Sequence, residues 1–193
     1  LAKIGISGVE SNLGTAVRTG VVLVMAWLIV FLKGKQSQIK TIDKKELLFI
    51  SLSGLATGAS WICYFKALSM ADVNKVVPID KSSTILSVLL AILIFEERQH
   101  LAVKLTGTAL LAAGIFLMIE RKDVEDKETG KSWLLFAALS AVFAALTSIL
   151  AKIGIENVNS HLATAIRTVV VVAMSWGMVF LTNTQNEMTQ IGK

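Results

Sequence analysis

Residue types on which many enzymes and disulfide-stapled domains depend are almost missing from this chain. Its 193 residues include one cysteine, one proline and two histidines. A single cysteine, Cys63, excludes an intrachain disulfide and a metal site built from cysteines alone. His100 and His161 have no partner at metal-ligand spacing. The sequence also lacks a Walker loop, an HExxH motif and a GxSxG motif, so we expect no enzyme, no cofactor and no metal site.

Charge is scarce as well. Charged residues make up 17% of the chain, whereas a soluble domain has about one quarter. Hydrophobic residues make up 54%, and the mean hydropathy is +0.67. The charges gather at 33–46, 96–104 and 120–131, and the apolar runs between them are roughly 20 residues long, enough for a helix to cross a bilayer. The composition therefore predicts an all-α polytopic protein surrounded by lipid.

These runs predict six full spans: Asn12–Leu32, Glu46–Leu68, Val73–Phe95, Leu101–Ile119, Ser132–Leu150 and His161–Leu181. Leu1–Ile6 resembles the end of a further span. The net charge of +5 comes mostly from loop lysines. In a membrane protein such lysines indicate orientation, so we expect no nucleic-acid partner.

The segment that starts at Leu150 repeats the segment that starts at Leu1. Leu1–Lys44 aligns without gaps to Leu150–Lys193, at an offset of 149 positions, and about half of the aligned residues are identical. The identical polar pairs include Lys3/Lys152, Ser11/Ser160, Thr15/Thr164, Arg18/Arg167, Thr19/Thr168 and Gln36/Gln185. The chain therefore contains an internal duplication.

The period of this duplication predicts an inverted architecture. One period holds five spans, and an odd number places the second copy upside down, as is common in secondary transporters. The loop after the Arg18 span carries five lysines, whereas the loop after the Arg167 span has none before Lys193. Since cytoplasmic loops are rich in lysine, the first loop is expected inside and its counterpart outside.

We therefore predict a helical bundle of two inverted five-span repeats, incomplete in this chain. Residues 1–120 form the first repeat without most of its first span, 121–131 form a linker, and 132–193 form the first two spans of the second repeat. The period extrapolates to a protein of ten spans and roughly 300 residues, of which this chain is a fragment.

Ionisable residues inside spans are the first candidates for function, because a charge in hydrocarbon costs at least about 2.5 kcal/mol. Arg18 and Arg167 lie about two turns into their spans, among small residues that favour a helix–helix face. As site residues they would face a central cavity and receive an anion. The alternative is that each arginine extends toward the lipid headgroups.

The span Val73–Phe95 holds the single proline, Pro78, followed at once by Asp80 and Lys81. A proline inside a helix breaks or kinks it, and transporters place substrates and coupling ions at broken helices. We predict that Asp80 and Lys81 contact substrate, and that Asp80 is the proton-coupling carboxylate and pairs with Arg18. The alternative is that Pro78 lies in the first turn of the helix, which would place Asp80 near the membrane–water interface.

The span Glu46–Leu68 combines packing and recognition signals. Gly54 and Gly58 have GxxxG spacing, which favours close helix packing over a polar cavity lining. Trp61 and Tyr64 are candidates for stacking on a substrate, although anchoring at the membrane interface is their more common role. Gly107 and Gly114 are expected to be packing glycines.

Three segments resemble the EamA-domain family of the drug/metabolite transporter superfamily: SGLATGASWICYFKAL, KVVPIDKSSTILSVLLAILIFEER and LTGTALLAAGIFLMI. The shared features are a glycine-rich span ending in an aromatic residue and Ala-Leu, an early proline, a closing acidic residue (Glu97 or Glu96) and two glycines seven apart. The resemblance covers essentially the whole chain. It implies ten spans in two inverted repeats, cytoplasmic termini and secondary carriers that often export amino acids, metabolites or drugs by alternating access.

The resemblance does not extend to Arg18, Asp80 and Lys81, whose roles rest on the residues alone. Three intramembrane cations against Asp80 favour an anionic or zwitterionic solute. We therefore expect a carrier that exports a small polar metabolite or amino acid across the plasma (inner) membrane, coupled to a proton or another ion. A cationic drug exporter and a non-transporting scaffold or receptor subunit are the alternatives, and a homo-oligomer stays open.

Overall fold

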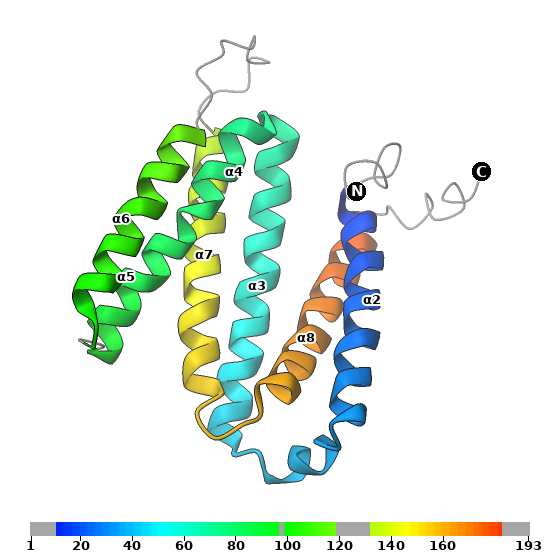
Figure 1. The fold of residues 1–193 in the computed structure, drawn as a ribbon. Helices are drawn as coiled ribbons and strands as arrows, with labels where there is room; N and C mark the ends of the chain where they lie inside the picture. Colours follow the sequence, from blue (N-terminus) through cyan, green and yellow to red (C-terminus); the bar gives the residue numbers. More distant parts are fainter. Residues whose placement is uncertain (1–10, 97–98, 119–131, 183–193) are drawn as a thin grey trace. The chain divides into compact units, whose positions relative to one another are not determined.

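The computed structural model describes residues 11–96, 99–118 and 132–182, and every regular element in these ranges is a helix (Figure 1). In chain order they are α2 (Ser11–Leu32), the 3₁₀-helix η1 (Gln36–Thr41), α3 (Lys44–Met70), α4 (Val73–Lys81), α5 (Ser83–Phe95), α6 (Leu101–Met118), α7 (Ser132–Gly154) and α8 (Ser160–Leu181). Six of the described segments are long and apolar enough to cross a membrane, with Val73–Phe95 counted as one. The predicted polytopic helical class and its six spans are confirmed.

Two helices extend beyond the predicted spans. α3 runs from Lys44 to Met70, and α7 continues to Gly154 rather than ending at Leu150. A helix forms all of its backbone hydrogen bonds internally, whereas a loop needs water or other partners. A membrane-spanning helix therefore often extends beyond its apolar stretch. The predicted span end at Leu1–Ile6 and the linker at 121–131 lie outside the described residues.

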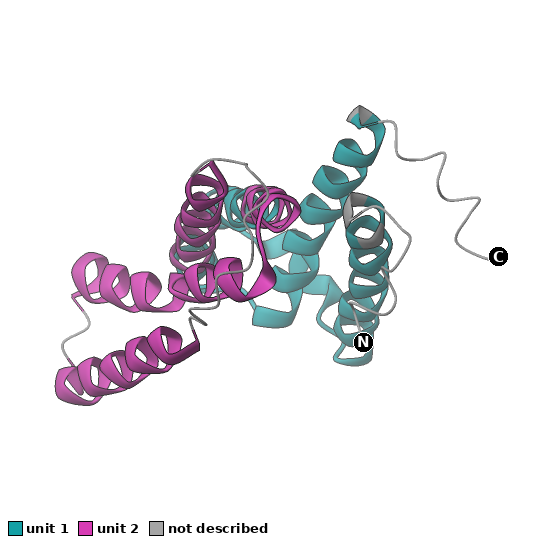
Figure 2. Cartoon of the chain, turned by 90° about the horizontal axis from the view of Figure 1, so that it is seen from above, with its two compact units in different colours: residues 1–58, 150–193 teal, residues 59–149 magenta. Residues whose placement is uncertain are grey.

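The chain divides into two compact units, residues 1–58 with 150–193 and residues 59–149 (Figure 2). We call them unit 1 and unit 2. Both boundaries fall within helices, so α3 and α7 each contribute to both units. The units are groupings in space, whereas the repeats are defined by sequence. The predicted division into 1–120, 121–131 and 132–193 stays a prediction.

In unit 1, α2 and α8 lie side by side and run in opposite directions (Figure 1). Val30 at the end of α2 belongs to the same buried cluster as Leu162 at the start of α8. Leu13 at the start of α2 is buried with Val179 at the end of α8. The two copies of the repeated segment are therefore packed antiparallel, as an inverted duplication requires.

The contact between α2 and α8 also has approximate two-fold symmetry. Residues of one cluster recur in the other at an offset of 149 positions, in the pairs Val30/Val179, Leu162/Leu13, Ala165/Ala16 and Trp27/Trp176. Such an interface, in which one surface is used twice, is the pattern that two-fold symmetry produces.

Smaller contacts repeat in the same way. The rings of Trp27 and Phe31 are 6.0 Å apart, and those of Trp176 and Phe180 are 6.1 Å apart. The hydroxyls of Thr19 and Thr168 each donate to a carbonyl one turn earlier, at 2.7 Å in both cases. The two helices therefore share local geometry as well as sequence.

α3 packs against α8 through the GxxxG glycines. A Cβ atom added at Gly54 would lie 2.8 Å from Val170 Cβ and 3.0 Å from the carbonyl oxygen of Arg167. One added at Gly58 would lie 2.5 Å from the sulfur of Met174. The glycines therefore permit close approach of the helices, and the predicted packing role is confirmed.

The expected packing role of Gly107 and Gly114 in α6 is wrong for the described structure. No described atom lies within 4 Å of a Cβ added at either glycine. Spacing shows which glycines share a helix face, but it does not show whether another helix covers that face.

Unit 2 has a small core made by α3, α4 and α7. Ala67, Val76 and Ala137 are buried together, and partly buried hydrophobic residues including Tyr64 and Ile79 pack against them. Pro78 is buried within α4 and has no N–H to donate. The helix is interrupted shortly afterwards, at Ser82 between α4 and α5.

The Gly54→Ala substitution is expected to lower the thermal unfolding midpoint in detergent. Its methyl group would meet backbone and a Cβ atom that cannot rotate away, an overpacking that costs about 1–3 kcal/mol. Gly20→Ala is the matched control, because a Cβ there meets nothing within 4 Å. That control should leave the midpoint unchanged or raise it, and an equal effect of both substitutions would contradict the packing role of Gly54.

Candidate functional sites

A pocket in unit 1 lies between the first half of α3 and the start of α8. Its volume is about 130 Å³. Most of the lining is small or hydroxyl-bearing, and one cation is present: Ile50, Ser53, Ala151, Ile155, Ser160, Ala163, Thr164 and Arg167. A pocket of this composition offers hydrogen-bond donors and one positive charge to a small solute.

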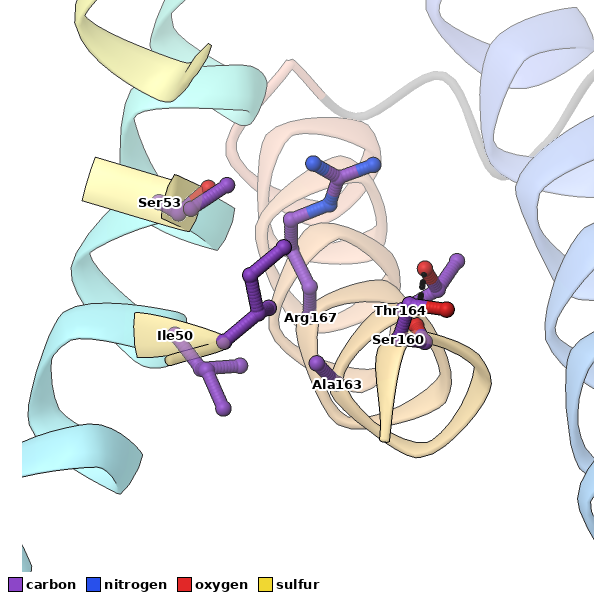
Figure 3. Close-up of a pocket in the computed structure, with 8 residues that line it drawn as sticks. Ile50, Ser53, Ser160, Ala163, Thr164 and Arg167 are labelled. Carbon is purple, nitrogen blue, oxygen red and sulfur yellow. Dashed lines mark hydrogen bonds between the residues drawn. The ribbon is translucent and has the colours of Figure 1, made fainter. Parts of the chain in front are cut away.

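Arg167 is the charged group of this pocket. Figure 3 shows its side chain between α3, which carries Ile50 and Ser53, and the first turns of α8. The guanidinium is half-buried and makes no hydrogen bond or ion pair with the residues that the structure describes. A guanidinium carries five N–H donors, so this group is able to bind a carboxylate or phosphate in a bidentate manner.

The position of the pocket on α8 reinforces the positive potential. Ser160, Ala163, Thr164 and Arg167 all belong to the first two turns of the helix. The N-terminus of a helix carries a partial positive charge, which falls off within the first turn. Both the arginine and the helix end therefore favour an anionic group.

A second polar group lies in unit 2 and joins α3, α4 and α7. The hydroxyl of Ser140 donates to Asp80 Oδ1 at 2.8 Å. The hydroxyl of Ser60 donates to the backbone carbonyl of Ser140 at 3.0 Å and lies 3.3 Å from its Oγ. Both serines are buried, so the carboxylate accepts from one neutral donor on α7, and Ser60 of α3 supports that donor.

The other predicted site residues of unit 2 differ in how exposed they are and in how they lie relative to Asp80. The Lys81 side chain is 63% exposed, whereas that of Asp80 is 19% exposed, and their charged atoms are 3.8 Å apart. Tyr64 packs against the same small core as Val76 of α4. Trp61 is half-buried one turn earlier on α3. The fold therefore brings Tyr64, Pro78 and Asp80 into one neighbourhood and leaves Lys81 facing outward.

Arg18 is exposed on α2, unlike its repeat partner Arg167. It belongs to unit 1, whereas Asp80 belongs to unit 2. The pairing of Arg18 with Asp80 stays a prediction.

Sequence reasoning singled out neither Ser140 nor the hydroxyls of α8. Ser140 is one of three hydroxyl-bearing residues in the apolar interior of α7, with Thr147 and Ser148, and the sequence did not distinguish it from the other two. Ser160 and Thr164 were named as repeat matches but not as pocket residues. Ser53 lines the pocket and is next to Gly54, which packs against α8. The helix with the GxxxG spacing therefore serves both for close packing and for lining a polar cavity.

Six membrane-length segments, an antiparallel pair of repeated helices and polar sites within those helices define a multi-pass membrane protein built like a carrier. The sequence profile of the EamA-like transporter family matches residues 1–120, and the chain belongs to this family. A protein of Sinorhizobium sp described as "Uncharacterized transporter in cobO 3'region" is 38% identical over 117 residues, which cover 61% of this chain and 82% of that protein. No solved structure matches the chain. The protein is therefore a membrane transporter.

Removing the hydroxyl of Ser140 is expected to weaken unit 2. Ser140→Ala leaves the partly buried carboxylate of Asp80 without this hydroxyl donor, which costs about 1–3 kcal/mol. In a double-mutant cycle of thermal unfolding, Ser140→Ala and Asp80→Ala should show a coupling of about 0.5–3 kcal/mol. Ser148→Ala, an exposed hydroxyl on the same helix, is the control and should not couple to Asp80. Strictly additive effects of Ser140→Ala and Asp80→Ala would contradict the bond.

Proposed function

We propose that this protein is a secondary carrier that exports a small, carboxylate-bearing polar metabolite, with amino acids among the candidates, across the plasma (inner) membrane by alternating access. The guanidinium of Arg167, which lies in its pocket without a partner among the described residues, is the observation that carries this proposal. A cation inside an apolar helix is costly, and an anionic solute would supply its missing partner.

The size of the pocket supports a small solute. Its volume of about 130 Å³ is below the roughly 300–1,000 Å³ of sites that enclose drug-sized ligands. It fits the carboxylate end of a metabolite together with a few neighbouring atoms. The hydroxyl-bearing residues Ser53, Ser160 and Thr164 suit the polar remainder of such a molecule.

Asp80 is the proposed site of the coupling proton. A serine hydroxyl both donates and accepts, so Ser140 can donate to the ionised carboxylate and accept from the protonated acid. The carboxyl group therefore keeps a partner in both protonation states. Its place on α4, two residues after Pro78, puts the proton beside the one backbone hydrogen bond that the proline cannot donate.

The alternatives make different demands on these sites. A cationic drug exporter needs a larger pocket with an acidic group, whereas the charged residue of the unit 1 pocket is an arginine. A scaffold or receptor subunit has no need of an intramembrane cation aimed at a pocket. The anionic carrier accounts for both the charge and the volume.

The Arg167→Gln substitution is expected to reduce carboxylate transport. In proteoliposomes that hold a panel of radiolabelled amino acids and small carboxylates, kcat/KM should fall about 10- to 100-fold, because a charged hydrogen bond contributes about 1.5–3 kcal/mol. Arg167→Lys should keep part of the activity, since it retains the charge but loses the bidentate geometry.

Lys40→Gln is the control for this experiment, because it removes one exposed positive charge from η1 without touching the pocket. Its transport should match that of the unsubstituted protein. Selective transport of cations, with carboxylates ignored, would overturn the proposal in favour of the drug exporter. Absence of flux for every solute would favour the scaffold.

Asp80→Asn is expected to uncouple transport from the proton gradient. The amide cannot take up a proton in this range, so an imposed pH difference should no longer drive flux, while solute exchange without a gradient continues. The measurement compares gradient-driven uptake with exchange in the same vesicles. If the variant responds to the gradient as the unsubstituted protein does, Asp80 is not the coupling group.

A further inference from the structure

The pocket beside Arg167 has a charged end and an apolar end. Arg167 of α8 lies next to Gly54 of α3, where an added Cβ atom would be 3.0 Å from the Arg167 carbonyl oxygen. One turn earlier on each helix, Ile50 of α3 and Ala163 of α8 belong to one buried cluster. Figure 3 shows the guanidinium and Ser53 on one level, with Ile50 and Ala163 on another. The pocket therefore presents both ends to a single solute.

The end of α7 enlarges the apolar end of the pocket. Ala151 and Ile155 also belong to the lining, so four aliphatic side chains face this space together with Ile50 and Ala163. Gly154 permits the approach of α7 to α3, because a Cβ atom there would lie 2.8 Å from Cγ1 of Ile50. A small surface of aliphatic carbon suits one short hydrocarbon group of a ligand.

We propose that the solute is a short aliphatic hydroxy acid, a monocarboxylate whose other polar group is uncharged, and that amino acids are poor substrates. This inference narrows the proposed carrier function and rests on it. The carboxylate binds the guanidinium of Arg167, and the short hydrocarbon chain contacts the aliphatic residues. The uncharged hydroxyl group bonds to a hydroxyl-bearing residue of the lining, for which Ser53, Ser160 and Thr164 are available.

The positive potential of the site acts against an amino acid. The ammonium group of an amino acid is attached to the carbon next to the carboxylate, so a carboxylate bound at Arg167 brings the ammonium close to the guanidinium. The pocket residues of α8 lie in its first two turns, where the helix dipole also disfavours a cation. Like charges held together at a partly desolvated site repel strongly. A hydroxyl group on the same carbon avoids this repulsion.

The described lining offers an ammonium group no counter-charge. Arg167 is the charged residue among the described residues that line the pocket, and the others are aliphatic or bear hydroxyls. Hydroxyls supply acceptors but no negative charge. The carboxylate of Glu46, one turn before Ile50, accepts from the side chain of Asn157 at 3.0 Å and from the backbone N–H of Asp43 at 3.2 Å. This acidic group is therefore engaged outside the pocket.

Matched pairs of solutes test the proposal. L-lactate and L-alanine share a carbon skeleton and differ in a hydroxyl or an ammonium group, and L-valine with its hydroxy acid analogue forms a second pair. Uptake of each radiolabelled solute is measured in proteoliposomes at neutral pH without a pH difference, and uptake by protein-free liposomes is subtracted. Each hydroxy acid should have a kcat/KM at least about tenfold above that of its amino acid, because the amino acid alone brings a like charge to the guanidinium.

Ile155→Ser tests the apolar end of the pocket. It should lower kcat/KM about tenfold for the hydroxy acid analogue of valine and less for lactate, because the larger hydrocarbon group loses more apolar contact. Ile155 is 37% exposed, so the substitution leaves the buried cluster intact. Ile39→Ser is the matched control, since Ile39 is exposed on η1 and lies outside the described lining. It should leave the transport of both hydroxy acids unchanged.

The outcomes separate this inference from the function on which it rests. If the amino acid of each pair is transported as well as its hydroxy acid or better, the inference is overturned and the carboxylate carrier stands. If neither member of either pair is transported, and no other carboxylate is, the proposed function itself fails. An equal effect of Ile155→Ser on both hydroxy acids would refute the contact with the apolar end.

Discussion

The antiparallel contact between α2 and α8 is the constraint from which the arrangement of unit 1 follows. Two helices of similar sequence that run in opposite directions meet through corresponding residues, so each apolar cluster has a counterpart at the other end of the contact. With this face of α8 committed to α2, the face bearing Arg167 is available to α3. The close approach at Gly54 then leaves a small pocket beside the guanidinium.

The charged groups inside apolar helices differ in whether the described structure gives them a hydrogen-bond partner. Asp80 is satisfied by Ser140, which is in turn held by Ser60, so a carboxylate lies among helices at little cost. Arg167 faces a pocket and has no partner among the described residues. Because hydrocarbon offers no water to bond a polar group, such a group needs a partner within the protein or from a ligand. Asp80 has a partner and suits a fixed ionisable site, whereas Arg167 suits a site to which the solute brings the partner.

The sequence alone was sufficient for the class, the spans and the inversion. Apolar runs of membrane length permit few structures other than helices, because every backbone group must be bonded within the segment. An odd number of spans in each repeat required the antiparallel relation that α2 and α8 display. The packing role of Gly54 and Gly58 also followed from their spacing. Gly107 and Gly114 are regularly spaced on one helix as well, but no described residue packs against them.

The partners of the charged residues were decided by tertiary structure. Arg18 and Arg167 have similar local sequences, yet Arg167 is half-buried in a pocket that Ile50 and Ser53 of α3 help to line, whereas Arg18 is exposed in the described part of the chain. No sequence signal distinguished Ser140 from Thr147 and Ser148 on the same helix, and it is the donor to Asp80 because α7 packs beside α4. Helical periodicity assigns residues to a face, but the neighbour of that face comes from another part of the chain, and therefore depends on how the helices pack.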